Sequence, residues 1–168
     1  MKRQARFTTG STMRHVIVMT TTGMIGLTFM FLIDAITLFW VSKLENESFM
    51  AAMGFAWTVQ FFTISFGIAF MIATTALVSR SLGAENWEDA RKQTSVFALL
   101  TFVTLSITVF FLLTFNKEIL ASIGARGIVL ETASTFLLIS VPSLPIMAIG
   151  MIGSAVLRAE GDGFRSMM

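Results

Sequence analysis

Four long apolar segments constrain this chain more than any other feature of its sequence. They cover residues 16–41, 53–78, 94–115 and 132–157, and each has at least 20 residues. About 20 apolar residues in a helix span the hydrocarbon core of a bilayer. Only helices and closed barrels satisfy every backbone N–H and C=O inside lipid, and barrel strands show ~10-residue alternating segments instead. The sequence therefore predicts an all-α integral membrane protein with four transmembrane helices.

Composition agrees with a membrane protein, because 55% of the 168 residues are hydrophobic and only 13% are charged, against about 25% in soluble domains. The basic start MKRQAR would suit a signal peptide. The apolar part of a signal peptide, however, has only about 7–15 residues and ends in a small-residue cleavage site. The first segment is much longer and ends in Trp40-Val41-Ser42-Lys43. We expect it to be a retained helix.

The basic residues predict the orientation of the chain. Positive residues concentrate on the cytoplasmic side of membrane proteins. Nine of the twelve lie in the N-terminal tail, the second connection and the C-terminal tail: Lys2, Arg3, Arg6, Arg14, Arg80, Arg91, Lys92, Arg158 and Arg165. The other two connections hold Lys43, Lys117 and Arg126. Both ends are therefore expected in the cytoplasm. Four crossings agree with this, because they return the chain to the side on which it began. The expected location is a cell membrane of the bacterial inner membrane type.

Several classes of function find no support in the residues. The chain has no cysteine and a single histidine, His15, at the membrane edge, which leaves no cluster of metal ligands. No GxxxxGK(S/T) or GxGxxG phosphate loop occurs, so ATP-driven chemistry is not encoded here. We expect neither an enzyme nor a cofactor nor a metal site, and no nucleic-acid partner. An energy source for transport would be an ion gradient.

The cytoplasmic connection SRSLGAENWEDARKQ carries recognisable helix-end signals. Gly83 suits a helix C-terminus, where a left-handed residue is tolerated. Asn86 followed by Asp89 resembles an N-cap with an acidic residue at the third helical position. The outer connection FNKEILASIGARGIVLE leaves room for a short surface helix.

Asp34 is the only charged residue among the 26 residues from Val16 to Val41. It lies about 10 Å from Val41 at 1.5 Å per residue. An ionised carboxylate at that depth costs at least ~2.5 kcal/mol, so intramembrane acids face an interior or a wet cavity. Removal from water favours the protonated form, and such an acid can exchange a proton or bind a small cation. Thr37 lies on the same helical stripe. The alternative is an acid that only hydrogen-bonds a neighbouring helix.

Gln60 is the next polar residue inside an apolar segment, in AWTVQFFTISF. Its amide can hydrogen-bond another helix, for a gain of ~0.6 kcal/mol, or contact a substrate, and the sequence leaves both roles open. Trp57 and Phe61 accompany Gln60 as candidate residues of a substrate cavity.

Pro142 and Pro145 are the only prolines of the chain, both in SVPSLPIMAIG. Each proline removes a helical N–H and clashes with the carbonyl four residues before it. The carbonyls of Leu138 and Val141 are expected to lose their helical partners, and the fourth helix is expected to kink there. Transporters use such breaks, and inert membrane helices also contain them.

Four pieces of the chain together resemble the multidrug and toxic compound extrusion (MATE) transporters. They are GSTMRHVIVMT, LIDAITLFWVSKL, ALVSRSLGAENWEDARK and VLRAEGDGFRSM, in that order. The resemblance implies twelve helices in two lobes, alternating access, and export of drugs or metabolites in exchange for H⁺ or Na⁺. Asp34 matches the family's first-helix acid, which serves cation coupling in several branches. The stretch MTTTGMIG lacks the proline that many members have early in the first helix.

The resemblance also predicts the organisation of the chain. Residues 1–15 form a cytoplasmic tail, and residues 16–158 form part of the N-terminal lobe. The expected helices are about 16–41, 53–78, 92–115 and 130–157, and residues 159–168 begin another cytoplasmic connection. The remainder of the transporter would then be missing. Its expected partners are the bilayer and a small lipophilic or cationic substrate.

Two other functions remain open at the level of sequence. A flippase for lipid-linked precursors would share the fold and would be favoured by a wide cationic cavity. The apolar segments contain no lysine or arginine. A four-helix membrane scaffold without transport would leave Asp34 without a strong physical reason for its position.

Overall fold

A computed structural model describes residues 11–43 and 47–161 of the protein, and the regular structure in these residues is entirely helical. The elements are α1 (Thr12–Ser42), α2 (Glu47–Gly83), α3 (Trp87–Thr114), α4 (Asn116–Ser122), α5 (Gly127–Ser140), the 3-10 turn η1 (Val141–Ser143) and α6 (Leu144–Ala159). Four helical stretches are long and apolar enough to cross a membrane: α1, α2, α3 and the combined stretch Gly127–Ala159. The prediction of an all-α protein with four transmembrane helices is confirmed.

The helices extend beyond the apolar segments that predicted them. The second span begins at Glu47 rather than about residue 53 and ends at Gly83 rather than 78, and the third begins at Trp87 rather than 92. Hydropathy marks where the chain leaves the hydrocarbon core. The backbone hydrogen bonds of a helix continue through polar residues until a cap ends them.

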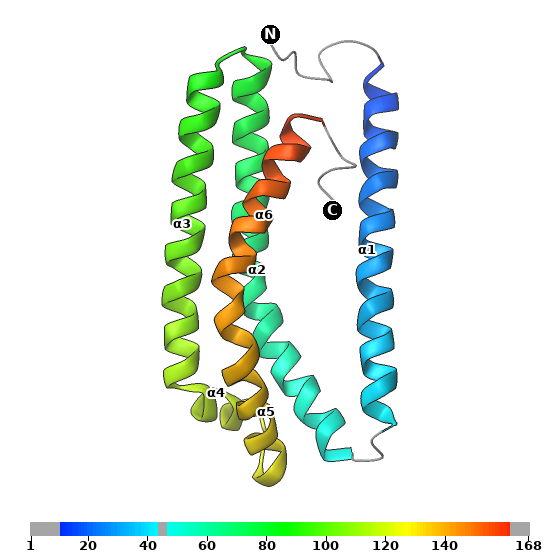
Figure 1. Ribbon diagram of the computed structural model, residues 1–168, viewed down its shortest axis with the longest axis vertical. Helices are drawn as coiled ribbons and strands as arrows, with labels where there is room; N and C mark the ends of the chain where they lie inside the picture. Colours follow the sequence, from blue (N-terminus) through cyan, green and yellow to red (C-terminus); the bar gives the residue numbers. More distant parts are fainter. Residues whose placement is uncertain (1–10, 44–46, 162–168) are drawn as a thin grey trace.

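Helices α2, α3 and α6 pack along one another, and α4 and α5 cover one end of this group (Figure 1). Alanines occupy several of the tightest positions: Ala52, Ala56, Ala133, Ala148 and Ala155 are at most 1% exposed. Small residues let helix backbones approach closely, which favours dispersion contacts where no hydrophobic driving force acts between membrane helices.

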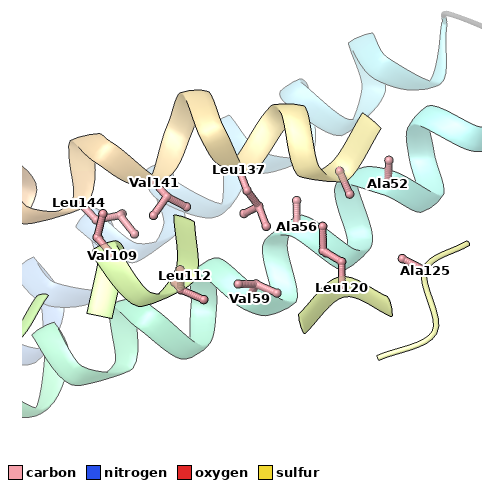
Figure 2. Packing of buried hydrophobic residues seen from close by; sticks show 11 residues of the cluster. Ala52, Ala56, Val59, Val109, Leu112, Leu120, Ala125, Leu137, Val141 and Leu144 are labelled. Atoms are coloured by element: carbon pink, nitrogen blue, oxygen red, sulfur yellow. The ribbon is translucent and has the colours of Figure 1, made fainter. Parts of the chain in front are cut away.

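The main core lies at the α4–α5 end of the bundle (Figure 2). It joins residues from α2, α3, the α4 region, α5, η1 and the start of α6: Ala52, Ala56, Val59, Val109, Leu112, Leu120, Ala125, Ala133, Leu137, Val141 and Leu144. At the same end, buried Ser134 on α5 donates a hydrogen bond of 2.5 Å to Asn116 Oδ1 at the start of α4. This core and this bond hold α4 and α5 against the ends of α2 and α3.

The connection between α2 and α3 ends one helix and starts the next within three residues. The N–H of Glu85 donates to the carbonyl of Leu82 at 3.1 Å, and the N–H of Asn86 donates to that of Ser81 at 2.9 Å. These two bonds make a Schellman motif. The left-handed residue is Glu85, with φ 56°, whereas we expected Gly83. The helix continues through Gly83, so the left-handed residue that closes the two crossed hydrogen bonds comes two residues later.

Asn86 caps α3 as expected. Its Oδ1 accepts from the Asp89 backbone N–H at 3.2 Å, and its Nδ2 donates to Asp89 Oδ2 at 2.6 Å. The pair satisfies a donor that the helix start would otherwise leave open.

Candidate functional site

Helix α1 carries the membrane-embedded acid and stands apart from the packed helices (Figure 1). No residue of α1 is buried. Its half-buried residues fall mostly in its first half: His15, Met19, Thr22, Gly23 and Gly26, with Val41 near its end. The first span is therefore bound to the bundle much less tightly than the other three.

Asp34 is exposed and makes no hydrogen bond or ion pair with a described residue. We expected the carboxylate to face the interior of a bundle, but in residues 11–43 and 47–161 no helix covers it. The reason is that α1 makes few contacts with the other helices and buries none of its residues, Asp34 included. It is also the only charged residue inside the four apolar segments.

Thr37 lies one helical turn from Asp34, where side chains three residues apart are neighbours. Its hydroxyl donates to the carbonyl of Ile33 at 2.9 Å. With its proton used inside the helix, the Thr37 oxygen keeps a free lone pair, so it can only accept a hydrogen bond. An oxygen acceptor beside a carboxylate suits a small cation better than an anion.

The candidate residues on α2 are Trp57, Gln60 and Phe61, and Gln60 lies beside the break between α5 and α6 at Val141–Ser143. Gln60 and Trp57 are half-buried, and Phe61 is 68% exposed. Gln60 Nε2 donates to Ser140 Oγ at 2.6 Å, across 80 residues of chain. Of the two roles left open by the sequence, the hydrogen bond to another helix is therefore present.

The two prolines interrupt the fourth span between α5 and α6. Residues Val141–Ser143 form a 3-10 turn, with Pro142 inside it and Pro145 in the first turn of α6. The expectation that the Val141 carbonyl has no partner is wrong. This carbonyl accepts from the N–H of Leu144 in the shorter 3-10 pattern. The hydroxyl of Ser143 donates to the carbonyl of Ser140 at 2.7 Å.

The structure brings Gln60 and the proline break together and leaves Asp34 and Thr37 apart from them. Among the described residues, no hydrogen bond joins Asp34 or Thr37 to Gln60 or to the break. The sequence reasoning missed Ser140, the residue that joins Gln60 to the break. A serine just before a proline-containing break was the available signal, because its hydroxyl can bond backbone that the helix interruption frees.

An open groove of about 470 Å³ runs along α5, and none of the predicted site residues lines it. Its lining is Ile128, Glu131, Thr132, Thr135, Phe136 and Ile139. The described residues contain no group of three His, Cys, Asp or Glu side chains that could hold a metal ion. Apart from tryptophan, the polar side chains inside the four apolar segments are Asp34, the serine and threonine hydroxyls and the amide of Gln60.

Comparison with known proteins identifies the family. The sequence model of the MatE family, the multidrug and toxic compound extrusion transporters, matches residues 23–168. The chain belongs to the MatE family. Its members are transporters rather than enzymes, which confirms the resemblance found in the sequence. The described helices also make this MatE chain a multi-pass membrane protein.

Relatives and solved structures agree with this assignment. Multidrug export protein MepA of Staphylococcus aureus (strain NCTC 8325) is 26% identical over 146 residues, which is 86% of this chain and 32% of MepA. This MatE chain thus spans about a third of the length of its curated relatives.

Three solved structures share the fold, each at 23% identity and covering 94% of this chain and 35% of the other. One is a MOP superfamily transporter from Pyrococcus furiosus described as having a binding pocket of reverse polarity, with a TM-score of 0.88. Another is a MATE protein in complex with MaD3S, with a TM-score of 0.87. The third is an outward-facing multidrug resistance MATE transporter, with a TM-score of 0.88.

Proposed function

We propose that this MatE chain belongs to a cation-coupled antiporter that exports lipophilic or cationic compounds in exchange for H⁺ or Na⁺. The observation that carries the proposal is Asp34, the single charge within four apolar segments of a chain in a transporter family. An ionisable residue in a membrane span marks an ion or proton pathway by default.

The coupling cycle follows from the chemistry of one carboxylate. Protonation of Asp34, or binding of Na⁺ with Thr37 as a second oxygen ligand, removes the local negative charge and favours one arrangement of the lobe. Release of the ion restores the charge and favours the other. The weak packing of α1, which has no buried residue, supports this cycle because the helix can shift without dismantling the core.

The substrate would contact α2 near the break in the fourth span. Trp57 and Phe61 offer aromatic faces, which attract cations and apolar groups alike. The exposure of Phe61, at 68%, supports a role in contact rather than in the core. The distribution of positive residues supports a cytoplasmic position for both ends of the chain, in a membrane of the bacterial inner membrane type.

A transport assay with the purified protein tests the proposal. The membrane-embedded protein is reconstituted into liposomes, and movement of a fluorescent lipophilic cation is followed after an H⁺ or an Na⁺ gradient is imposed separately. We expect transport to depend on one of the two gradients and to stop when the matching ionophore collapses it. Transport that persists without either gradient, or no transport of any lipophilic cation, would refute the proposal.

A lipid-linked precursor flippase is the other candidate of related fold, but no described observation favours it. The apolar segments provide no lysine or arginine for a diphosphate group. Family membership likewise gives the scaffold hypothesis no support.

A further inference from the structure

The hydrogen bonds around Ser140 determine the orientation of the Gln60 amide. Gln60 Nε2 lies 2.6 Å from Ser140 Oγ, which lies 2.8 Å from the carbonyl oxygen of Phe136. A hydroxyl has one proton to donate, and a carbonyl can only accept. The Ser140 proton therefore lies on the bond to Phe136, and Ser140 can only accept from Gln60. The two ends of an amide are otherwise interchangeable, but here the NH₂ group must face Ser140.

The carbonyl end of the same amide is left free. No described residue donates to Gln60 Oε1. The atom is also accessible at the surface. Every fully buried side-chain oxygen in the described residues that are not exposed has a hydrogen-bond partner, and Oε1 of the half-buried Gln60 has none. Gln60 thus presents an oriented hydrogen-bond acceptor at a half-buried position, held there by its own NH₂ group.

The surroundings of this acceptor suit a positively charged N–H donor on an apolar body. Trp57 lies three residues before Gln60, which places its aromatic side chain on the same face of α2. No charged residue occurs in residues 53–78. A cation can lie against an aromatic face while its N–H donates to the amide oxygen, and no neighbouring basic side chain on this helix competes for that oxygen.

We propose that Gln60 is a specificity-determining residue that selects ligands with an N–H donor, such as protonated amines, over ligands of equal charge that lack one. This inference rests on the proposed export of lipophilic cations and names the chemical class within it. A group built to form a hydrogen bond disfavours an analogue that leaves it unpaired. Because Oε1 is open at the surface, water partly replaces the lost bond, and the expected preference is about tenfold.

A matched pair of ligands tests the inference directly. One is a lipophilic tertiary amine at a pH where it is protonated, and the other is its N-methylated quaternary ammonium, which keeps the charge and lacks the N–H. Equilibrium binding is measured to the protein in lipid nanodiscs, with protein-free nanodiscs subtracted. We expect the protein to bind the tertiary amine about tenfold more tightly and Gln60→Met, similar in length but apolar, to bind both equally. An equal preference in the protein and in Gln60→Met would overturn the inference.

Ser140→Ala provides a second test that retains the Gln60 side chain and removes only its hydrogen-bond partner. Without Ser140 the amide is free to rotate, so we expect the preference to fall to a value between those of the protein and Gln60→Met. An unchanged preference in Ser140→Ala would contradict the role given to this serine. Binding of both ligands without any preference refutes the inference alone. Binding of neither ligand refutes the proposed function together with it.

Gln93→Met is the matched control. Gln93 on α3 also joins two helices, since its Oε1 accepts from Ser81 Oγ on α2 at 3.1 Å. This bond lies near the C-terminal end of α2, whereas Gln60 and the break lie nearer its N-terminal end. We expect Gln93→Met to retain the full preference for the tertiary amine. A loss as large as that of Gln60→Met would show that weakened helix packing, rather than the acceptor, causes the effect, and would overturn the inference.

Discussion

Gly67 on α2 lies directly against Met151 on α6, so that a Cβ atom at Gly67 would be 3.0 Å from Met151 Sδ. It would also lie 3.6 Å from Cδ1 of Leu105 on α3. The three helices of the bundle therefore meet at a position where only hydrogen fits without displacement. Small residues at such crossings permit close backbone approach in membrane proteins.

Gly67→Val is expected to destabilise the bundle by about 1–3 kcal/mol, because the added methyl groups overpack this crossing. Thermal unfolding in detergent, followed by circular dichroism, measures the change. Gly54→Ala on the same helix is the control, because a Cβ at Gly54 meets nothing within 4 Å. It should leave the midpoint unchanged or raise it slightly. Equal losses in the two variants would mean that Gly67 matters for reasons other than this crossing.

Glu85 occupies a left-handed conformation that favours glycine. Its φ is 56°, and the crossed hydrogen bonds of the α2 terminus depend on it. Glu85→Gly is therefore expected to stabilise the protein by about 1 kcal/mol, and Glu85→Val to destabilise it. Ala84→Gly, one residue earlier and outside the left-handed region, should bring no gain. The same unfolding experiment checks this, and a lower midpoint for Glu85→Gly would contradict the geometry.

The absence of cysteine from the sequence makes orientation simple to measure. Lys117 and Glu88 are both exposed, on α4 and at the start of α3. In intact cells a membrane-impermeant maleimide should label Lys117→Cys, and it should label Glu88→Cys only after permeabilisation, because positive residues favour the cytoplasmic side. The opposite pattern would reverse the proposed orientation.

The local parts of this fold could be predicted from the sequence, and the long-range parts could not. Length and hydropathy alone determine the number of spans, and the Asn86–Asp89 pair marks the start of α3. Gly83 was a reasonable choice for the left-handed residue by composition. The structure uses Glu85 instead, because the position is set by which carbonyls the last N–H groups can reach.

The partners of the polar residues were out of reach for a physical reason. These spans are apolar on every side, so no polar stripe indicates which face of a helix meets which neighbour. Gln60 and Ser140 are 80 residues apart, and only the packing of α5 against α2 brings them together. The exposed setting of Asp34 was equally unpredictable, because it depends on how α1 sits beside the bundle.

Gradient-driven efflux by Asp34→Asn tests the central claim most directly. Asparagine keeps the shape and polarity of the side chain but cannot ionise, so the variant should insert normally and lose export driven by H⁺ or Na⁺. Asp34→Glu, which keeps the carboxylate, should retain part of the activity. We predict full membrane insertion of all three proteins, with efflux by Asp34→Asn at the background level. Efflux by Asp34→Asn at the rate of the unaltered protein, with the same dependence on the gradient, would contradict the account.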